Sequence, residues 1–244
     1  MARDFNGSTQ TAWSTFPSIV GAKSISLWIY PDTTTAGMRF ASFNATGSNL
    51  YISNGGTGDI NATFVFSGTD LTRRSSTFPV NIGAWNHIAI LHSGSTLITQ
   101  LYMYVNGTEV AYAAGVNATG TETATNSVYF GSYLGSSLWF NGKIAEFAYW
   151  NTMLEVAQIV GLSRGYSPLL FKPQSLISYH QLIGRTSPEI DLVGGYGMTL
   201  ANAPTAAAHP RIIYPSNHQA GLHFTPASAA SPYMTTSPGL WGPL

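Results

Sequence analysis

The sequence predicts an all-β protein, a sandwich or barrel of short antiparallel strands, with one short helix and an extended C-terminal arm. Alternation of apolar and polar residues recurs in short segments, and turn-forming residues separate these segments at fairly even spacing. Only one stretch, directly behind a late strand, has helical spacing. Many short strands of this kind are typical of sandwiches and barrels and not of parallel α/β folds. The 244 residues, 44% of them hydrophobic, supply a sizeable core.

The first clear strand is "KSISLWIYP", residues 23–31. Ile25, Leu27 and Ile29 alternate with serines and aromatic residues, and Pro31 ends the segment, which is the period-two signature of a strand. Similar patterns predict further strands around Phe64 and Phe66 and over residues 85–94, 126–133 and 142–150.

Residues 100–113, "QLYMYVNGTEVAYA", predict the clearest hairpin. The apolar positions 101, 103 and 105 face one way, and the two tyrosines between them face the other. Asn106 and Gly107 follow, and both tolerate the positive φ that a tight hairpin turn needs.

The segment "NTMLEVAQIVGLSRG", residues 151–165, predicts the one helix. Leu154, Ala157 and Ile159 fall on one stripe of a helix. Glu155 and Gln158 suit the first turn of this helix. Gly165 and Pro168 are expected to end it. A single short helix behind a late strand is expected to cover an exposed edge or end of a sheet.

Composition excludes several classes of function. Ten basic residues balance ten acidic ones, so the chain has no electrostatic footprint for nucleic acid or an anionic membrane. The absence of cysteine excludes a disulfide framework. We also expect no membrane span, since no apolar run approaches about 20 residues, and no export signal, since the N-terminus lacks an apolar core. Only 8% of the residues are charged, which indicates either a surface covered by partners or an ordinary Thr/Ser/Asn-rich β surface.

Six segments together resemble the laminin G-like, concanavalin A-like family over about residues 4–170. They are "FNGSTQ", "SISLWIYP", "WNHIAI", "LYMYVNGTEV", "VYFGSYLGSSLWFNGKIAEFAYWN" and "LEVAQI", in the order and spacing of that family. The resemblance implies a jelly-roll sandwich of two antiparallel sheets over residues 1–172, with the helix as the family's late L-S-x-x-E-I element.

The stretch from Leu176 to Pro215 is similar to segments that follow such domains in phage and phage-like structural proteins. We interpret residues 173–215 as returning strands that complete the sandwich, because the stretch keeps a regular apolar pattern. A generic linker is the alternative.

Catalysis is not expected. The resemblance implies that an enzyme of this fold would carry an E-x-D-x-x-E strand, whose alternation sets its carboxylates on one face, and the chain has none. Glu189 and Asp191 are the closest acidic pair, and their position between Pro188 and Gly194 indicates a loop. The chain also lacks a G-x-S-x-G nucleophile motif.

No cofactor is predicted, and calcium is left as an alternative. Many relatives hold calcium, but the family's I-D-E reads Ile144-Ala145-Glu146 here, so the aspartate is missing. Lone aspartates in candidate loops usually cap turns, and the chain has three of them, Asp32, Asp59 and Asp70. The histidines are dispersed, which does not favour zinc.

Tryptophan is the residue expected to carry any glycan contact, because an indole can stack on the apolar face of a sugar ring. Trp28, Trp85 and Trp150 match core positions of the family and are interpreted as structural. Trp139, in the loop "GSSLWFNG", is the best candidate for an exposed glycan-binding residue, with packing as the alternative.

Residues 216–244 predict a disordered or extended arm, because they are rich in Pro, Ala and Ser and have no periodicity. Apolar anchors spaced along this arm suit docking into grooves of a neighbouring protein; they are Leu222, Phe224, Tyr233, Met234, Leu240 and Trp241.

The sequence therefore predicts a phage virion structural protein that is made in the host cytoplasm, most simply a capsid decoration or auxiliary subunit. Its partners would be the major capsid protein or other virion subunits, and it would form a homo-oligomer. The alternative is a carbohydrate-recognition module of a tail or receptor-binding structure, with a glycan as its partner.

Overall fold

The structure is a computed structural model that describes residues 1–33, 35, 37–43, 48–53, 59–77, 79–113, 115–183 and 187–215. Residues 1–214 form one compact unit. The predicted arm, with its six anchors from Leu222 to Trp241, lies outside the described residues. Within the described ranges, no helix is long and apolar enough to span a membrane.

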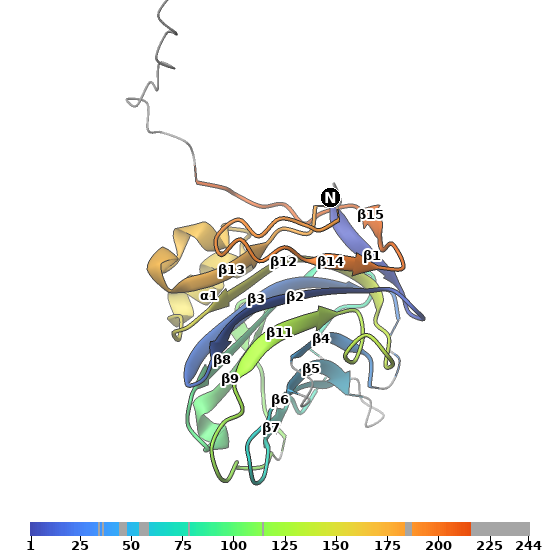
Figure 1. Cartoon of the computed structure of the whole chain (residues 1–244). Coiled ribbons are helices and arrows are strands. Elements are labelled where there is room, and N and C mark those ends of the chain that lie inside the picture. The colour runs from blue at the N-terminus through green and yellow to red at the C-terminus, as the bar shows by residue number, and fades with distance from the viewer. Residues whose placement is uncertain are drawn as a thin grey trace, which may run out of the picture. The chain divides into compact units, whose positions relative to one another are not determined.

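Two antiparallel sheets face each other and confirm the predicted all-β sandwich (Figure 1). The eight-stranded sheet has the order β10 (Thr108–Glu109), β9 (Leu101–Val105), β8 (Asn86–Ser93), β3 (Ala22–Pro31), β12 (Asn141–Trp150), β1 (Ala2–Asn6), β15 (Thr205–Ala207), and β13 (Leu176–His180) also pairs with β12. The seven-stranded sheet has the order β14 (Thr199–Ala201), β2 (Thr11–Ile19), β11 (Thr125–Phe130), β4 (Arg39–Phe43), β5 (Ser48–Ser53), β6 (Asp59–Phe64), β7 (Leu71–Arg74).

The main core lies between the sheets and follows the predicted alternation. Ile25, Leu27 and Ile29 of β3 are fully buried in it, and Phe147 and Tyr149 of β12 join them. Burial of these side chains is the main favourable term in folding, at roughly 25 cal/mol per Å² of apolar surface.

None of the three tryptophans expected in the core lies between the sheets. Trp28 lies between inward-facing neighbours on β3 and therefore faces outward, half-buried, with its ring centroid 5.3 Å from that of His87. Trp85 is also half-buried, just before β8. Trp150 is fully buried, but on the outer side of the eight-stranded sheet.

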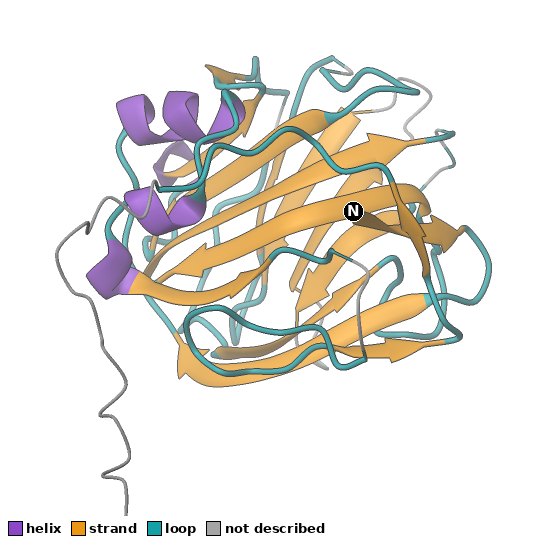
Figure 2. Ribbon diagram, turned by 90° about the horizontal axis from the view of Figure 1, so that it is seen from above, coloured by secondary structure: helices purple, strands orange, loops and turns teal. Residues whose placement is uncertain are grey.

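The helix α1 (Val156–Ser163) covers this outer side. Ile159 and Leu162 of α1 pack in a second apolar cluster with Trp150 and Leu91, and α1 lies over one corner of the strands (Figures 1 and 2). The helix was expected to cover a sheet edge or end, and it covers an outer face of the sheet near the ends of β12 and β13. The outward side chains of β8, β12 and β13 are apolar near this corner, so a face needed covering. Ala157, expected on the apolar stripe, is exposed.

The predicted signals at the ends of α1 are confirmed. Glu155 and Gln158 form a capping box, in which the Glu155 backbone N–H donates to the Gln158 side chain at 2.9 Å. The helix ends at Ser163, and Gly165 follows with a φ of 86°. Pro168 then begins the short 3-10 helix η2 (Pro168–Leu170); two further 3-10 turns are η1 (Ile98–Gln100) and η3 (Pro173–Ser175).

The predicted hairpin is confirmed as β9 and β10, with Asn106 at a φ of 51° and Gly107 at 82°. Strand β2 was not predicted, because Pro17 interrupts its pattern. On one side of β2, Pro17 lies at a register shift between β2 and β11. On the other side, β14 pairs only with residues 11–13 of β2. No hydrogen bond between strands therefore requires the N–H that proline lacks.

The segment 173–215 supplies strands to both sheets. β13 pairs with β12, β14 with β2, and β15 with β1. One edge of β12 is shared, since β1 pairs with its first half and β13 with its second. Glu146 lies at the junction with a φ of 57°. The N-terminal strand and the late segment are thereby brought to the same region of the sheet.

Candidate functional site

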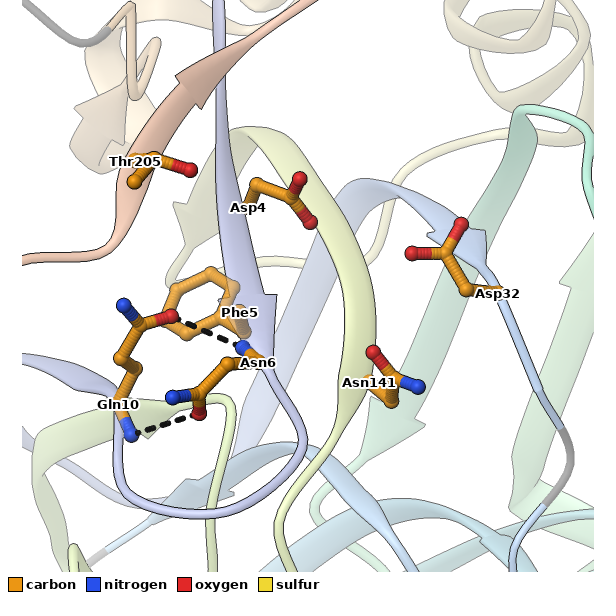
Figure 3. Close-up of a pocket in the computed structure, with 7 residues that line it drawn as sticks. All are labelled: Asp4, Phe5, Asn6, Gln10, Asp32, Asn141 and Thr205. Atoms are coloured by element: carbon orange, nitrogen blue, oxygen red, sulfur yellow. Dashed lines mark hydrogen bonds between the residues drawn. The ribbon is translucent and has the colours of Figure 1, made fainter.

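A polar pocket of about 230 Å³ lies where β1, β12 and β15 meet. Its lining comes from four separate parts of the chain, and Figure 3 shows the side chains: Asp4, Phe5, Asn6, Gln10, Asp32, Asn141 and Thr205. Carboxylates, amides and a hydroxyl outnumber the single aromatic ring, so the pocket offers hydrogen-bond donors and acceptors more than apolar surface.

Strand register builds the first side of the pocket. Thr205 lies opposite Asp4, Asp4 lies opposite Lys143, and Lys143 lies opposite Tyr30. This row crosses β15, β1, β12 and β3. Because Phe5, next to Asp4, is buried between the sheets, the row faces outward from the sandwich.

A second outward row lies two residues further along the strands. Asn6 is opposite Asn141, and the Asp32 backbone N–H donates to the Asn141 carbonyl at 3.0 Å. The pocket is the space between the two rows, with Asp4 on one side and Asp32 on the other (Figure 3).

The turn after β1 holds two amide side chains at the rim of the pocket. The Asn6 side-chain oxygen accepts from the backbone N–H groups of Ser8 and Thr9, at 3.0 and 3.1 Å. The Asn6 N–H in turn donates to the Gln10 side chain at 2.9 Å (Figure 3). Gly7 has a φ of 69°, and a Cβ there would lie 2.8 Å from the Asn141 Cβ. The "FNGSTQ" segment is therefore a local unit that requires its glycine.

The "FNGK" segment requires its glycine too. Gly142 has a φ of 144°, and a Cβ would lie 2.2 Å from the Tyr30 carbonyl oxygen. Only glycine lets β12 approach β3 this closely. The neighbours of Gly142, namely Asn141 and Lys143, are thus fixed at the pocket.

Charges of both signs meet beside the pocket. The Lys143 ammonium donates to Asp32 at 3.0 Å and lies 4.3 Å from the centroid of the Tyr30 ring. Both partners of this ion pair are partly exposed, so solvent screens it. The site can therefore offer carboxylate acceptors, an ammonium donor and neutral amides to one ligand.

Two aromatic residues adjoin the charged row, and we call them the aromatic corner: Tyr30 and Trp85. Their ring centroids are 5.7 Å apart with an interplanar angle of 72°. Both are half-buried. Trp85 was interpreted as a core residue from the sequence; its partial exposure beside Tyr30 instead makes it part of the outer surface.

The predicted glycan residue, Trp139, is separate from this site. It lies in the loop between β11 and β12, is half-buried, and is not among the residues that line the pocket. A more exposed tryptophan is Trp13, at 37%, which stacks on Tyr129 on the outer face of the other sheet. The sequence did not single it out, because β2 was not recognised as a strand.

The acidic residues considered from the sequence have structural partners. Glu189 forms a buried ion pair with Arg3 at 2.6 Å, and Asp191 accepts from the backbone N–H of Tyr179 at 2.9 Å. Asp70 caps a turn by accepting from the Phe66 N–H at 3.1 Å, and Asp59 pairs with Arg74 at 2.9 Å.

Among the described residues, no group of three or more His, Asp or Glu side chains could hold a metal ion. The two carboxylates that the fold does bring to one pocket are Asp4 and Asp32. Sequence reasoning missed this pair, because Asp4 and Asp32 are 28 positions apart and the whole of β2 and β3 lies between them along the chain.

A comparison with family models matches residues 5–160, well over half of the chain, to the concanavalin A-like lectin/glucanases superfamily. No curated protein matches the chain.

Two solved structures share the fold. A putative carbohydrate binding protein from Bacteroides ovatus is 18% identical, with a TM-score of 0.63 over 87% of this chain and 61% of its own length. A native heptameric SAP-like pentraxin from Limulus polyphemus is 16% identical, with a TM-score of 0.50 over 66% of this chain and 81% of its own. At these identities the likeness shows the fold alone.

Proposed function

The chain belongs to the concanavalin A-like lectin/glucanase superfamily, and from this premise we propose that it is a non-catalytic module that binds a carbohydrate in the pocket between Asp4 and Asp32. The mixture of hydrogen-bonding groups in a small concave site carries this proposal. Sugar hydroxyls both donate and accept, so they require carboxylate oxygens, amides and hydroxyls in close proximity.

The size of the pocket fits part of a carbohydrate. Pockets for drug-sized ligands span about 300–1,000 Å³, and this pocket is smaller, at about 230 Å³. It suits one sugar ring. The hydrogen-bonding groups stand on paired strands and on a glycine-dependent turn, so they are held before the ligand arrives, which lowers the entropic cost of binding.

The same geometry argues against hydrolysis. A glycosidase needs two carboxylates flanking the scissile bond, one as acid and one as nucleophile or base. An enzyme of this fold would carry its carboxylates on one E-x-D-x-x-E strand, which this sequence lacks, and the two carboxylates of the pocket, Asp4 and Asp32, come from separate segments. We therefore expect binding without release of reducing sugar.

The experiment is a screen on a glycan array followed by calorimetry with the selected glycan. Asn141→Ala removes one pocket amide but keeps the backbone, and we expect it to weaken binding about tenfold or more, the equivalent of about 1.4 kcal/mol. Thr199→Ala is the matched control, because Thr199 is an exposed strand residue of the other sheet. An array without any bound glycan, or an Asn141→Ala variant that binds like the wild type, would overturn the proposal.

We propose as a second candidate that the protein acts within a virion, as the sequence predicts. Two sequence features support this, namely the similarity of residues 176–215 to segments of phage structural proteins and the charged fraction of only 8%. The two proposals are compatible if the protein is a receptor-binding part of a particle. The capsid decoration role and the capsid partner stay predictions.

The test of the virion role uses the predicted arm. Truncation after Pro215 should leave a folded sandwich, because residues 1–214 form a compact unit by themselves. The truncated protein, checked by circular dichroism, would be mixed with particles that lack the native subunit. We expect it to bind far below full occupancy; full occupancy would show that the arm is not the attachment element.

A further inference from the structure

The aromatic corner continues the same outward row that forms one side of the pocket. The row runs from Thr205 and Asp4 through Lys143 to Tyr30, and Trp85 meets Tyr30 edge to face. Neighbouring strands lie about 4.8 Å apart, so Tyr30 on β3 is about 10 Å from Asp4 on β1, measured across the strands. Trp85 lies on the far side of Tyr30 and extends the row further.

We propose that the aromatic corner is a second sugar subsite, so that the ligand is an oligosaccharide of at least two rings that runs across the strands from the pocket to Trp85. This inference rests on the proposed function and names the class of its ligand. The pocket holds the first ring through hydrogen bonds, and the corner holds the next ring through contact with an aromatic face.

The chemistry of the two subsites is complementary. The pocket lining is mainly carboxylate, amide and hydroxyl, whereas the corner offers two aromatic rings at a steep angle. A pyranose ring has polar hydroxyl edges and a more apolar C–H face, and these suit the pocket and the corner respectively. An aromatic face can contact many kinds of sugar ring. The corner would therefore favour a longer oligosaccharide, whereas the hydrogen bonds in the pocket would select the kind of sugar.

Lys143 stands between the subsites and can serve both. Its ammonium now contacts Asp32 and the Tyr30 ring. Because the ion pair with Asp32 is partly exposed, it is weak, and the ammonium can exchange the carboxylate for a sugar oxygen on its flexible stem. Tyr30 then gains an open face for the second ring.

Titration of matched mono- and trisaccharides of glucose, N-acetylglucosamine, galactose and mannose tests this inference. For the series that binds, we expect the trisaccharide to bind about tenfold or more tightly than the monosaccharide. Trp85→Ala should abolish this gain and leave the monosaccharide affinity unchanged. Trp13→Ala is the matched control, since Trp13 is an exposed tryptophan of the opposite sheet, and it should change neither affinity.

A measurement on the wild-type protein covers the case in which Trp85→Ala does not fold. The indole N–H resonance of Trp85 should shift in NMR spectra on adding the trisaccharide and stay in place with the monosaccharide. Equal affinity for both sugars, or an unmoved Trp85 signal, would overturn the second subsite while binding in the pocket stands. Failure of every sugar to bind would overturn the proposed function as well.

Discussion

Lys23 brings an ammonium into a fully buried position near the start of β3. It donates to the Gly21 carbonyl at 2.8 Å and to the Glu122 carboxylate, which also accepts from the Gly21 N–H at 2.9 Å. Burial lowers the pKa of Lys23, and the adjacent Glu122 carboxylate opposes that shift. The pair ties the loop before β11 to the edge of the core.

Lys23→Met should therefore destabilise the protein strongly. Removing one partner leaves the Glu122 charge desolvated and unpaired, which costs about 3–5 kcal/mol in free energy of unfolding. Lys143→Met is the matched control, because its ion pair is partly exposed and should cost at most about 1 kcal/mol. Urea unfolding of both variants measures the difference. Equal losses would mean that the Lys23 pair is as solvated as the surface pair.

At the scale of elements, α1 is stabilised by packing on the outer face of the eight-stranded sheet and not by its own length. A helix of eight residues is too short to be stable alone. Ile159→Ala, in the buried stripe of α1, should cost about 2–5 kcal/mol in unfolding free energy. Val156→Ala, at a position that is 56% exposed, should change it by less than about 0.5 kcal/mol. Thermal unfolding followed by circular dichroism would report both; a negligible effect of Ile159→Ala would contradict the packing.

Elements with strong local signals could be predicted from the sequence. The alternation in β3 and the Asn106-Gly107 turn are local, and so is the capping box of α1. What α1 covers could not be predicted, because β12 is apolar on both faces near its end, and alternation alone does not say which face meets the other sheet. Trp28 and Trp85 were assigned to the core from the resemblance to the family, and both are half-buried here.

The candidate site depends on register, which local patterns do not contain. Asp4 and Thr205 are 201 positions apart, yet they lie opposite each other because β1 pairs with β15. The "FNGSTQ" and "FNGK" segments were recognised from the sequence only as features of a family. In the structure, Gly7 and Gly142 closely approach neighbouring strands, and this approach positions Asn6 and Asn141. Trp139 was chosen because its loop looked exposed, and its half-buried state could not be foreseen.

At the scale of the whole molecule, buried histidines make stability depend on pH. Burial lowers the pKa of His87 to about 3 and that of His180 to about 4, and it also lowers the pKa of His92. In the unfolded chain each histidine titrates near 6.5. Between about pH 6.5 and 4 the unfolded chain therefore binds protons that the folded protein does not.

Stability should be greatest above about pH 6.5 and should fall as the pH drops to about 4, by about 1.4 kcal/mol per pH unit for each of His87 and His180. The lowered pKa of His92 acts in the same direction. Urea unfolding across this range measures the slope. His180→Gln removes one of the three titrating groups, so its slope should be shallower. Stability that is constant or rises as the pH falls would contradict the burial of these side chains.

The sandwich presents a concave polar site, built by strand register, next to an aromatic corner on its outer surface. The central claim about this site is that a sugar ring occupies the pocket of Asp4, Asp32 and Asn141. A crystal structure with the glycan selected on the array tests this claim most directly. We predict a ring hydrogen-bonded to these three side chains; a glycan bound instead at Trp13 or Trp139, with this pocket empty, would contradict it.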